Sequence, residues 1–344
     1  MDSERKFAFC KGVFISKGDI ESYEDIEDFV HSLSSCNINS VFIEAEEYPL
    51  KLIKALHNHG MRFFASFSVF ADSTILQKRP ELVAINAEGM KMEADEGYVG
   101  LCPTNERYRM EKLEALSNLV ESYDIDGVWL DFIRYPARWE KPKPILRQYC
   151  FCQSCLQKFS EDTGILLIGE KPRDKAEFIL SKHAKAWVNW KCKVIAEFVR
   201  QAKQRIAKVR PWIPLGAFTV PWKDNDFGGA IKLIIGQDFK LLSKWVDIFS
   251  PMAYHRLCGK SVEWVGEVTK YMVESTNRQV WTTIQSYDVP ICEFMSALEQ
   301  TVRSGSSGVI VFHWNGVKQS GERIEVLRNF FKKPMENFEV KAIN

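Results

Sequence analysis

The 344-residue sequence contains no long hydrophobic run and almost no excess of charge of one sign. No segment approaches the roughly 18 consecutive apolar residues that indicate a membrane-spanning helix. The N-terminal segment carries charges without an apolar region after them, so it does not resemble a signal peptide. The net charge of +1 gives no overall attraction to nucleic acid or to anionic lipid. We therefore expect a cytoplasmic protein that binds neither nucleic acid nor a membrane.

Several catalytic signatures are also missing. No glycine-rich fingerprint follows the first predicted strand, which argues against a dinucleotide-binding fold. No Gly-x-Ser-x-Gly motif supports an esterase, and no His-x-His motif on the first predicted strand supports a metallohydrolase. Residues 303–308 are rich in glycine and serine but lack the Gly-Lys-Ser/Thr ending of a phosphate-binding loop. We expect no organic cofactor.

Short apolar runs recur along the chain and alternate with helical patterns. The predicted strands are 13–16, 40–44, 62–67, 127–131, 214–219, 247–252, 279–284 and 308–313. The predicted helices lie near 25–36, 49–59, 105–123, 182–208, 237–245, 260–276, 290–304 and 321–332. Such alternation is typical of parallel βαβ units, and eight units predict an α/β protein with a (β/α)8 TIM barrel. A doubly wound open sheet is the alternative.

Two predicted connections are too long for simple loops. Residues 68–104 follow the third strand, and residues 136–181 follow the fourth. Long connections in a compact domain usually carry function, and both leave the carboxyl ends of strands, where barrel enzymes build their sites. No low-complexity segment, repeat or Gly/Ser linker divides the chain, so residues 1–344 are predicted to form a single domain with two insertions at the C-terminal face.

The segment 126–136 reads Asp-Gly-Val-Trp-Leu-Asp-Phe-Ile-Arg-Tyr-Pro. It contains the fourth predicted strand, which ends at the carboxylate of Asp131. Pro136 lacks a backbone N–H and cannot continue a central strand. Asp131 therefore stands where the strand ends, and a carboxylate there is costly to desolvate unless it is paired or functional. We predict that Asp131 is catalytic or binds substrate directly. A structural ion pair with Arg134, itself a candidate substrate-binding residue, is the alternative.

Acid/base catalysis by carboxyl groups commonly uses a second carboxyl group beside the first. Glu44 and Glu46 follow the second strand on one face, and either is a candidate catalytic partner. Ion pairs with basic residues on neighbouring strand ends are the alternative for both. Glu140, in the second insertion, either reaches the site or is a solvated loop charge.

Aromatic and polar residues gather at the later strand ends, where they could form the rim of a carbohydrate site. Sugar rings present C–H faces that stack on aromatic rings and hydroxyls that need polar partners. Any one of these side chains is more often a packing residue, so the indication comes from the collection. The candidate substrate-binding residues, besides Arg134, are Trp222, Tyr254, His255, Gln285, Tyr287, His313, Trp314 and Asn315.

Four of the nine cysteines suggest a metal site. Cys150, Cys152 and Cys155 lie within six residues, and Cys102 ends the first insertion. Tetrahedral zinc takes four sulfur or nitrogen ligands, and four thiolates leave no open position. We predict a structural Zn2+ that joins the two insertions. Ordinary reduced thiols, expected in a reducing compartment, are the alternative.

The same cysteines resemble those of glycoside hydrolase family 42 β-galactosidases, in the pattern Cys102-Pro103-Thr104-Asn105 followed by Cys150-x-Cys152-x-x-Cys155. The segment from Arg79 to Cys102 is also similar to that superfamily. Segments 126–136 and 250–255 resemble the hypothetical glycosyl hydrolase families, which are barrel proteins.

The sequence departs from family 42 at its catalytic positions. That family carries an Asn-Glu acid/base pair on strand 4, where this chain has Leu130-Asp131, and Gln285 stands at the end of the seventh strand in place of a Glu. The catalytic pair of family 42 therefore does not transfer to this chain.

These observations favour a glycoside hydrolase that cleaves an oligo- or polysaccharide by carboxylate acid/base chemistry. A non-catalytic carbohydrate-binding barrel is one alternative, and a transferase or lyase acting on a sugar derivative is another. The expected partner is a carbohydrate substrate. The sequence leaves open whether the protein forms a homo-oligomer.

Overall fold

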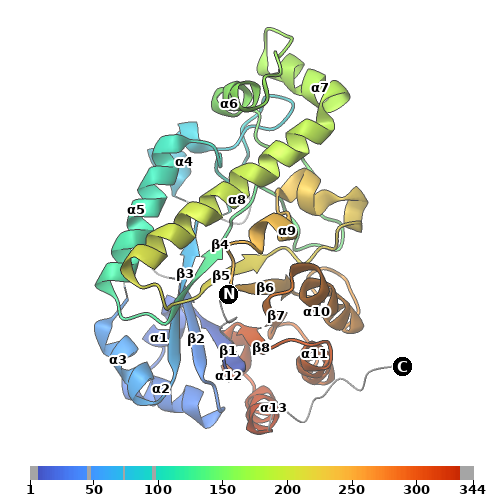
Figure 1. The fold of residues 1–344 in the computed structure, drawn as a ribbon. Coiled ribbons are helices and arrows are strands. Elements are labelled where there is room, and N and C mark those ends of the chain that lie inside the picture. Colours follow the sequence, from blue (N-terminus) through green and yellow to red (C-terminus); the bar gives the residue numbers. More distant parts are fainter. Residues whose placement is uncertain (1–6, 45–47, 73, 95–97, 334–344) are drawn as a thin grey trace.

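A computed structural model describes residues 7–44, 48–72, 74–94 and 98–333. Eight parallel strands close into a barrel in which each strand pairs with its neighbours in sequence and β8 pairs with β1. The strands are β1 (Cys10–Ile15), β2 (Ser40–Glu44), β3 (Arg62–Ser68), β4 (Gly127–Asp131), β5 (Leu215–Thr219), β6 (Ile248–Ala253), β7 (Gln279–Gln285) and β8 (Gly308–Phe312). The predicted TIM barrel is confirmed (Figure 1).

Helices surround the strands and carry the chain from one strand to the next. They are α1 (Lys17–Glu21), α2 (Ile26–Ser35), α3 (Leu50–Asn58), α4 (Ile75–Lys78), α5 (Glu106–Ser122), α6 (Gln153–Thr163), α7 (Pro172–Lys182), α8 (Ala184–Val209), α9 (Phe239–Leu242), α10 (Glu263–Thr276), α11 (Ile291–Arg303), α12 (Trp314–Lys318) and α13 (Gly321–Lys332). The long predicted helices are present. The helix expected over 237–245 is shorter, because α9 covers Phe239–Leu242 alone.

Large aromatic side chains fill the barrel interior. Trp129 from β4 stacks on Trp281 from β7 with 5.0 Å between ring centroids, and Phe42 and Phe64 pack against both. The indole N–H of Trp129 donates to the Ser250 hydroxyl at 2.9 Å, so its one polar group is satisfied. The interior is thus a packed core, and a substrate can enter only at an end of the barrel.

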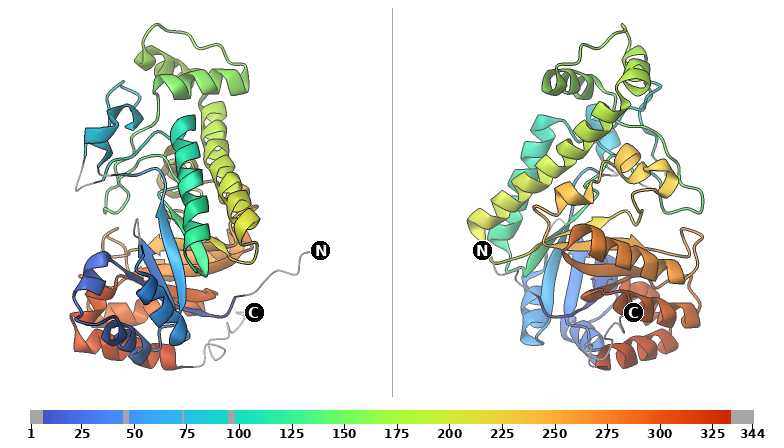
Figure 2. Two further views of the ribbon diagram at one scale, coloured as in Figure 1. Left: turned by 90° about the vertical axis from the view of Figure 1, so that its left-hand side faces the viewer. Right: turned by 45° about the vertical axis from the view of Figure 1, so that its right-hand side comes forward.

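The two insertions pair with each other beyond the carboxyl ends of β3 and β4. Asn86 of the first insertion forms an antiparallel bridge with Tyr149 of the second, and the N–H of Phe151 donates to the carbonyl of Ile85 at 2.8 Å. In Figure 2, α4, α6 and α7 gather at one end of the molecule, and α8 runs from them along the barrel beside α5. Within the described residues, no helix is long and apolar enough to cross a membrane.

Candidate active site

Asp131 lies at the carboxyl end of β4, where its half-buried side chain meets the barrel mouth. It pairs in register with Ser68 of β3, and Glu44 ends β2 on the other side of that strand. The pKa of Asp131 is raised to about 7, chiefly by burial and also by the charges of Glu44 and Glu140. The Phe132 N–H, which donates to the carboxylate at 2.6 Å, and the charge of Arg134 oppose the shift. Asp131 can therefore hold or release a proton near neutral pH.

Glu44 supplies a second carboxyl group at the same end of the barrel. Its side chain reaches solvent, but the surrounding protein atoms still raise its pKa by desolvation, while the charge of Lys112 lowers it. Lys112 donates to the backbone carbonyl of Ser68 at 3.0 Å, which anchors this positive charge beside β3. The other predicted partner, Glu46, lies outside the described residues.

Glu140 is a third carboxyl group within electrostatic reach of Asp131. Its charge raises the pKa values of Asp131, Tyr254 and Tyr287, although burial is the largest cause for all three. Tyr254 follows β6 and Tyr287 follows β7, so the second insertion brings Glu140 back over the mouth. Glu140 thus interacts with the site, which the sequence had left open against a solvated loop charge.

Arg134 does not form the ion pair that the sequence suggested as an alternative. Among the described residues, no salt bridge joins it to Asp131. Its guanidinium is buried and donates to the Tyr98 hydroxyl and to the Ala137 carbonyl, each at 3.1 Å. It also lies over the rings of Tyr98 and Phe132, 5.3 and 5.1 Å from their centroids. Arg134 therefore shapes the loop after β4.

Phe132 has a left-handed backbone conformation, with φ of +50°. Residues other than glycine rarely adopt it, and such strain concentrates at functional sites. The N–H of the same residue donates to the neighbouring carboxylate of Asp131.

A chain of stacked rings forms one wall of the mouth, which we call the aromatic wall. It consists of Trp139, Tyr254, Phe312, Tyr287 and His313. Tyr254 stacks between Trp139 and Phe312 at centroid distances of 5.8 and 5.1 Å, and Tyr287 stacks on His313 at 5.2 Å. Phe312, Tyr287 and His313 are only half-buried, so their faces are available to a ligand. Residues from β6, β7 and β8 supply this wall together with the second insertion.

The other predicted rim residues have partners within the protein. His255 is buried and lies 3.1 Å from Glu293, and burial lowers its pKa. The Gln285 amide bonds the backbone of Leu257 and of Tyr287, and the Trp314 indole donates to the Tyr23 hydroxyl at 3.3 Å. Because their polar atoms bond to other protein groups, His255, Gln285 and Trp314 are placed to stabilise the loops of the mouth.

Trp222 and Asn315 are the two remaining candidate substrate-binding residues. Trp222 lies at the rim beside Phe227, with 5.0 Å between ring centroids. Asn315, in α12, is half-buried. Their roles in substrate binding stay predictions.

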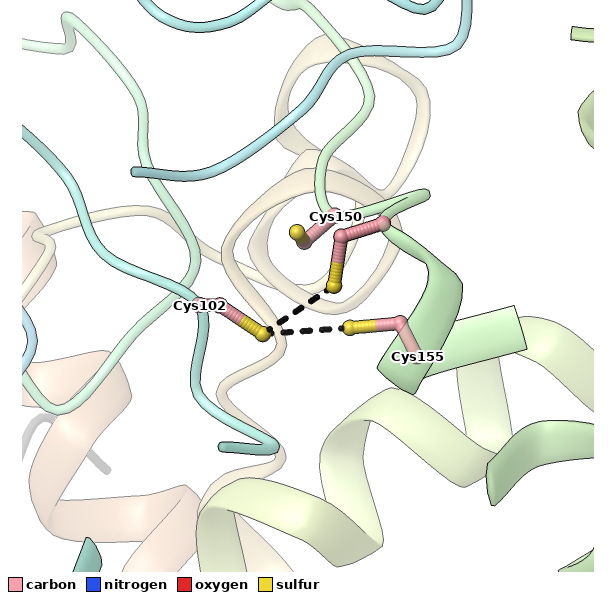
Figure 3. A group of neighbouring side chains, drawn as sticks. Cys102, Cys150 and Cys155 are labelled. Atoms are coloured by element: carbon pink, nitrogen blue, oxygen red, sulfur yellow. Dashed lines mark hydrogen bonds between the residues drawn. The ribbon is translucent and has the colours of Figure 1, made fainter. Parts of the chain in front are cut away.

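The four cysteines lie together beside the mouth. Cys102 is 3.4 Å from both Cys152 and Cys155, and the four sulfur atoms all lie within 4.8 Å of one another. Figure 3 shows Cys102 reaching from the first insertion toward the cysteines of the second. Zinc–sulfur bonds of about 2.3 Å place tetrahedral sulfur atoms about 3.8 Å apart, which this cluster matches closely.

The surroundings of the cluster also suit a metal. The Ile85 N–H donates to the sulfur of Cys150 at 3.4 Å, as outer groups around ligating thiolates commonly do. Hydrogen bonds from Cys102, Cys150 and Cys155 hold the pKa of Cys152 below its ordinary value, whereas burial raises the pKa values of Cys150 and Cys155. A divalent cation would compensate the charge of four thiolates, of which those of Cys102, Cys150 and Cys155 are buried.

A groove of about 1030 Å3 lies away from the mouth, between α5, α6, α8 and α9. None of the predicted site residues lines it. We therefore place the chemistry at the strand ends, where the carboxyl groups and the aromatic wall meet, and not in this groove.

Solved structures with a similar fold are carbohydrate-active proteins. The PgaB (BpsB) glycoside hydrolase domain from Bordetella bronchiseptica is 12% identical with a TM-score of 0.74, and the match covers 94% of this chain and 99% of that one. The family 42 β-galactosidase Gan42B from G. stearothermophilus, in a catalytic-mutant form, is 16% identical with a TM-score of 0.67, and the match covers 96% of this chain and 57% of that one. The chain thus spans little more than half of that β-galactosidase. At these identities the likeness shows the fold alone.

A comparison with curated protein sequences finds no match. Residues 29–303, most of the chain, match the family DUF4015, described as "Putative glycosyl hydrolase domain". The resemblance to the hypothetical glycosyl hydrolase families is therefore confirmed, and the chain belongs to this glycosyl hydrolase domain family.

Proposed function

We propose that the protein hydrolyses glycosidic bonds of an oligo- or polysaccharide, with Asp131 as the general acid. The observation that carries the proposal is the pKa of about 7 at Asp131, raised by burial and by two neighbouring carboxylates. A protonated carboxyl group at neutral pH can donate to the leaving oxygen as the glycosidic bond breaks. The aromatic wall beside it offers stacking surfaces for the sugar rings.

Glu44 is the proposed partner carboxylate. The charge of Lys112 favours its ionised form, which a nucleophile or a general base requires. In the first case Glu44 attacks the anomeric carbon, and in the second it takes a proton from the attacking water. Glu140 strengthens the field that keeps the proton on Asp131.

The test is a screen of aryl glycosides and oligosaccharides with the native protein, Asp131→Asn and Asp288→Asn. Asp131→Asn is expected to reduce kcat/KM by about 100-fold or more, the usual contribution of a general acid. Asp288→Asn is the matched control, because Asp288 is an exposed acid at the end of β7 with φ of +50°, which asparagine tolerates. Its kcat/KM should be close to the native value.

Three outcomes separate the proposal from its rivals. Turnover that survives Asp131→Asn contradicts the assigned role of Asp131. Sugar binding without turnover favours a carbohydrate-binding barrel, a reading to which Gln285 at the end of β7 lends weight. Products with a new glycosidic bond or a new double bond indicate a transferase or a lyase.

A structural zinc ion is part of the same proposal. Cys102, Cys150, Cys152 and Cys155 would hold it, and four thiolates would leave no position open for substrate. Its role is to fix the two insertions beside the mouth. Reduced thiolates suit a reducing compartment, so a cytoplasmic location also stays a prediction.

A further inference from the structure

A small pocket opens at the rim of the barrel, on the loops that follow β5 and β6. Its volume is about 220 Å3, and its aromatic lining consists of Trp222, Phe227 and Trp264. We call it the rim pocket. Four charged side chains, Lys223, Asp226, Lys260 and Glu267, also line it. It is of a size for one sugar ring, not for an oligosaccharide.

Phe227 lies in the rim pocket with a solvent exposure and a backbone conformation that are both unfavourable for phenylalanine. The side chain is 40% exposed, and the residue has φ of +50° and ψ of +41°. Both features are unfavourable for phenylalanine in a free protein, because an apolar ring faces water and a Cβ crowds its backbone. Gly228 follows it directly and adopts such a φ without cost. A ring held in this way is typical of a site that a ligand covers.

Hydrogen bonds lock the turn that presents Phe227. The Lys223 N–H donates to the Asp226 carboxylate at 2.8 Å, and the Gly229 N–H donates to the Asp226 carbonyl at 3.0 Å. Trp222 supports the ring from within, since its own side chain is only 3% exposed. The aromatic face is therefore preorganised, and a sugar can stack on it without ordering the loop.

The rim pocket contains two lysines and two carboxylates, and Lys260 is the lysine without an ion-pair partner among the described residues, since the Asp226 carboxylate accepts from the Lys223 backbone N–H. Lys223 pairs with Glu267 at 3.0 Å, which neutralises both. The ammonium group of Lys260 lies 5.9 Å from the centroid of the Phe227 ring, and no described carboxylate forms an ion pair with it. A negative group on a ring stacked against Phe227 would therefore meet a free ammonium group.

The rim pocket adjoins the candidate active site through one loop. Tyr254, in the aromatic wall, begins the segment that ends at Lys260. Within that segment, Cys258 contacts the carbonyl of Trp139 at 4.0 Å, and Gly259 packs closely against Pro142. The segment 254–260 thus links the aromatic wall directly to the rim pocket.

We propose that the rim pocket binds a sugar ring that carries a carboxylate, a uronic acid unit, away from the bond that is cleaved. Phe227, supported from within by Trp222, would stack on the C–H face of the ring, and Lys260 would pair with its carboxylate. The role as a substrate subsite rests on the proposed glycosidase function, whereas the binding itself does not.

Saturation-transfer NMR with free sugars tests the binding without turnover. The probes are glucuronate and galacturonate, each compared with glucose or galactose. The native protein should bind the uronates about tenfold more tightly than the neutral hexoses, as a charge-assisted contact predicts. Lys260→Met should abolish that preference and leave hexose binding unchanged. Lys270→Met, which removes an exposed lysine from α10 outside the pocket, is the matched control.

The Phe227→Asn variant tests the contribution of the aromatic ring to binding without disturbing the fold of the turn. Asparagine tolerates the left-handed conformation, so the turn should keep its structure while the stacking face is lost. Binding of all four sugars should then weaken about tenfold or more, since stacked aromatic contacts contribute on this scale. Leu166→Ala, which removes another exposed apolar side chain, should change nothing.

The results distinguish this inference from the proposed function. Equal affinity for uronates and hexoses, no binding to the native protein, or a preference that survives Lys260→Met overturns the rim-pocket inference even if glycosides are cleaved. If the sugars bind as predicted but no glycoside is cleaved, the rim-pocket inference is supported and the proposed glycosidase function is contradicted. Asp131→Asn should bind the uronates as the native protein does.

Discussion

Among single residues, Asp131 has surroundings that link stability to function. Its neighbours raise its pKa from the ordinary 3.8 to about 7, so the folded protein binds a proton that the unfolded chain releases. The ionised carboxylate is therefore a source of instability in the fold above neutral pH. The general-acid role proposed for Asp131 would require this environment, at the expense of stability.

Replacement of Asp131 by asparagine should stabilise the protein in alkaline solution. Below about pH 4 the carboxyl is protonated in both states, so native and variant should differ little. As pH rises toward 7 the unfolded chain ionises first, and the native protein progressively loses stability relative to the variant. Above about pH 7 the free energy of unfolding of the variant should exceed that of the native protein by on the order of a few kcal/mol. Denaturant unfolding at several pH values measures this, and equal stabilities at pH 8 would contradict the raised pKa.

A second prediction concerns the charge of Glu44. The Glu44→Gln change removes a negative neighbour and should lower the pKa of Asp131, with no need for substrate. Carbon-13 NMR titration of the aspartate carboxyls detects the shift. Glu325→Gln, on the exposed face of α13, serves as the control and should leave the titration unchanged. An unaltered midpoint in Glu44→Gln would show that the two carboxyls do not interact.

Residues at strand ends were predictable, but residues returning from insertions were not. The position of Asp131 followed from the apolar strand before it and the proline after it. Glu140 approaches the site through the path of the second insertion, which no local pattern specifies. Gln285, Trp314 and His255 stood at the expected strand ends, but only packing shows that their polar atoms bond to the protein.

Among the elements, the two insertions depend on each other. Neither contains a long helix before α6. One isolated bridge, between Asn86 and Tyr149, and the four-cysteine cluster join them. Few backbone hydrogen bonds join them, so a bound metal would contribute much of their stability.

Zinc removal should therefore loosen the insertions more than the barrel. We expect about one equivalent of zinc in the purified protein by elemental analysis, and much less in Cys102→Ser. In that variant, hydrogen exchange should accelerate in residues 80–103 and 148–160, while β1 and β8 stay protected. Cys292→Ser, at the exposed cysteine of α11, should retain the metal and the native exchange pattern. The metal site would be refuted if the purified native protein contained no zinc and all four cysteines reacted as free thiols.

At the scale of the whole molecule, the barrel is closed around large and small side chains that alternate across its interior. A Cβ atom added to Gly216 in β5 would lie 2.1 Å from the Trp129 indole. The stacked pair Trp129–Trp281 spans the barrel from β4 to β7, so displacement of Trp129 would disturb opposite strands together.

Gly216→Ala should consequently lower the free energy of unfolding by about 1–3 kcal/mol or more, the usual cost of overpacking a core. Gly321→Ala is the matched control at the start of α13, where an added Cβ meets nothing within 4 Å. It should be neutral or should stabilise by about 0.4–1 kcal/mol through the unfolded chain. Thermal or denaturant unfolding compares the two. A Gly216→Ala protein as stable as the native one would mean that the indole has another position available.

The alternation of strands and helices determined the barrel by itself, because buried parallel strands need apolar runs and each crossover needs a helix. The cysteine spacing likewise indicated three ligands of one cluster, since those residues are close along the chain. Tertiary structure alone decided how the site is assembled. The pKa of Asp131 lies near 7 because of burial first and of the charges of Glu44 and Glu140 second, and the rim pocket joins loops after two different strands. Burial and charge act through space, and their effects depend on distances that a linear pattern does not contain.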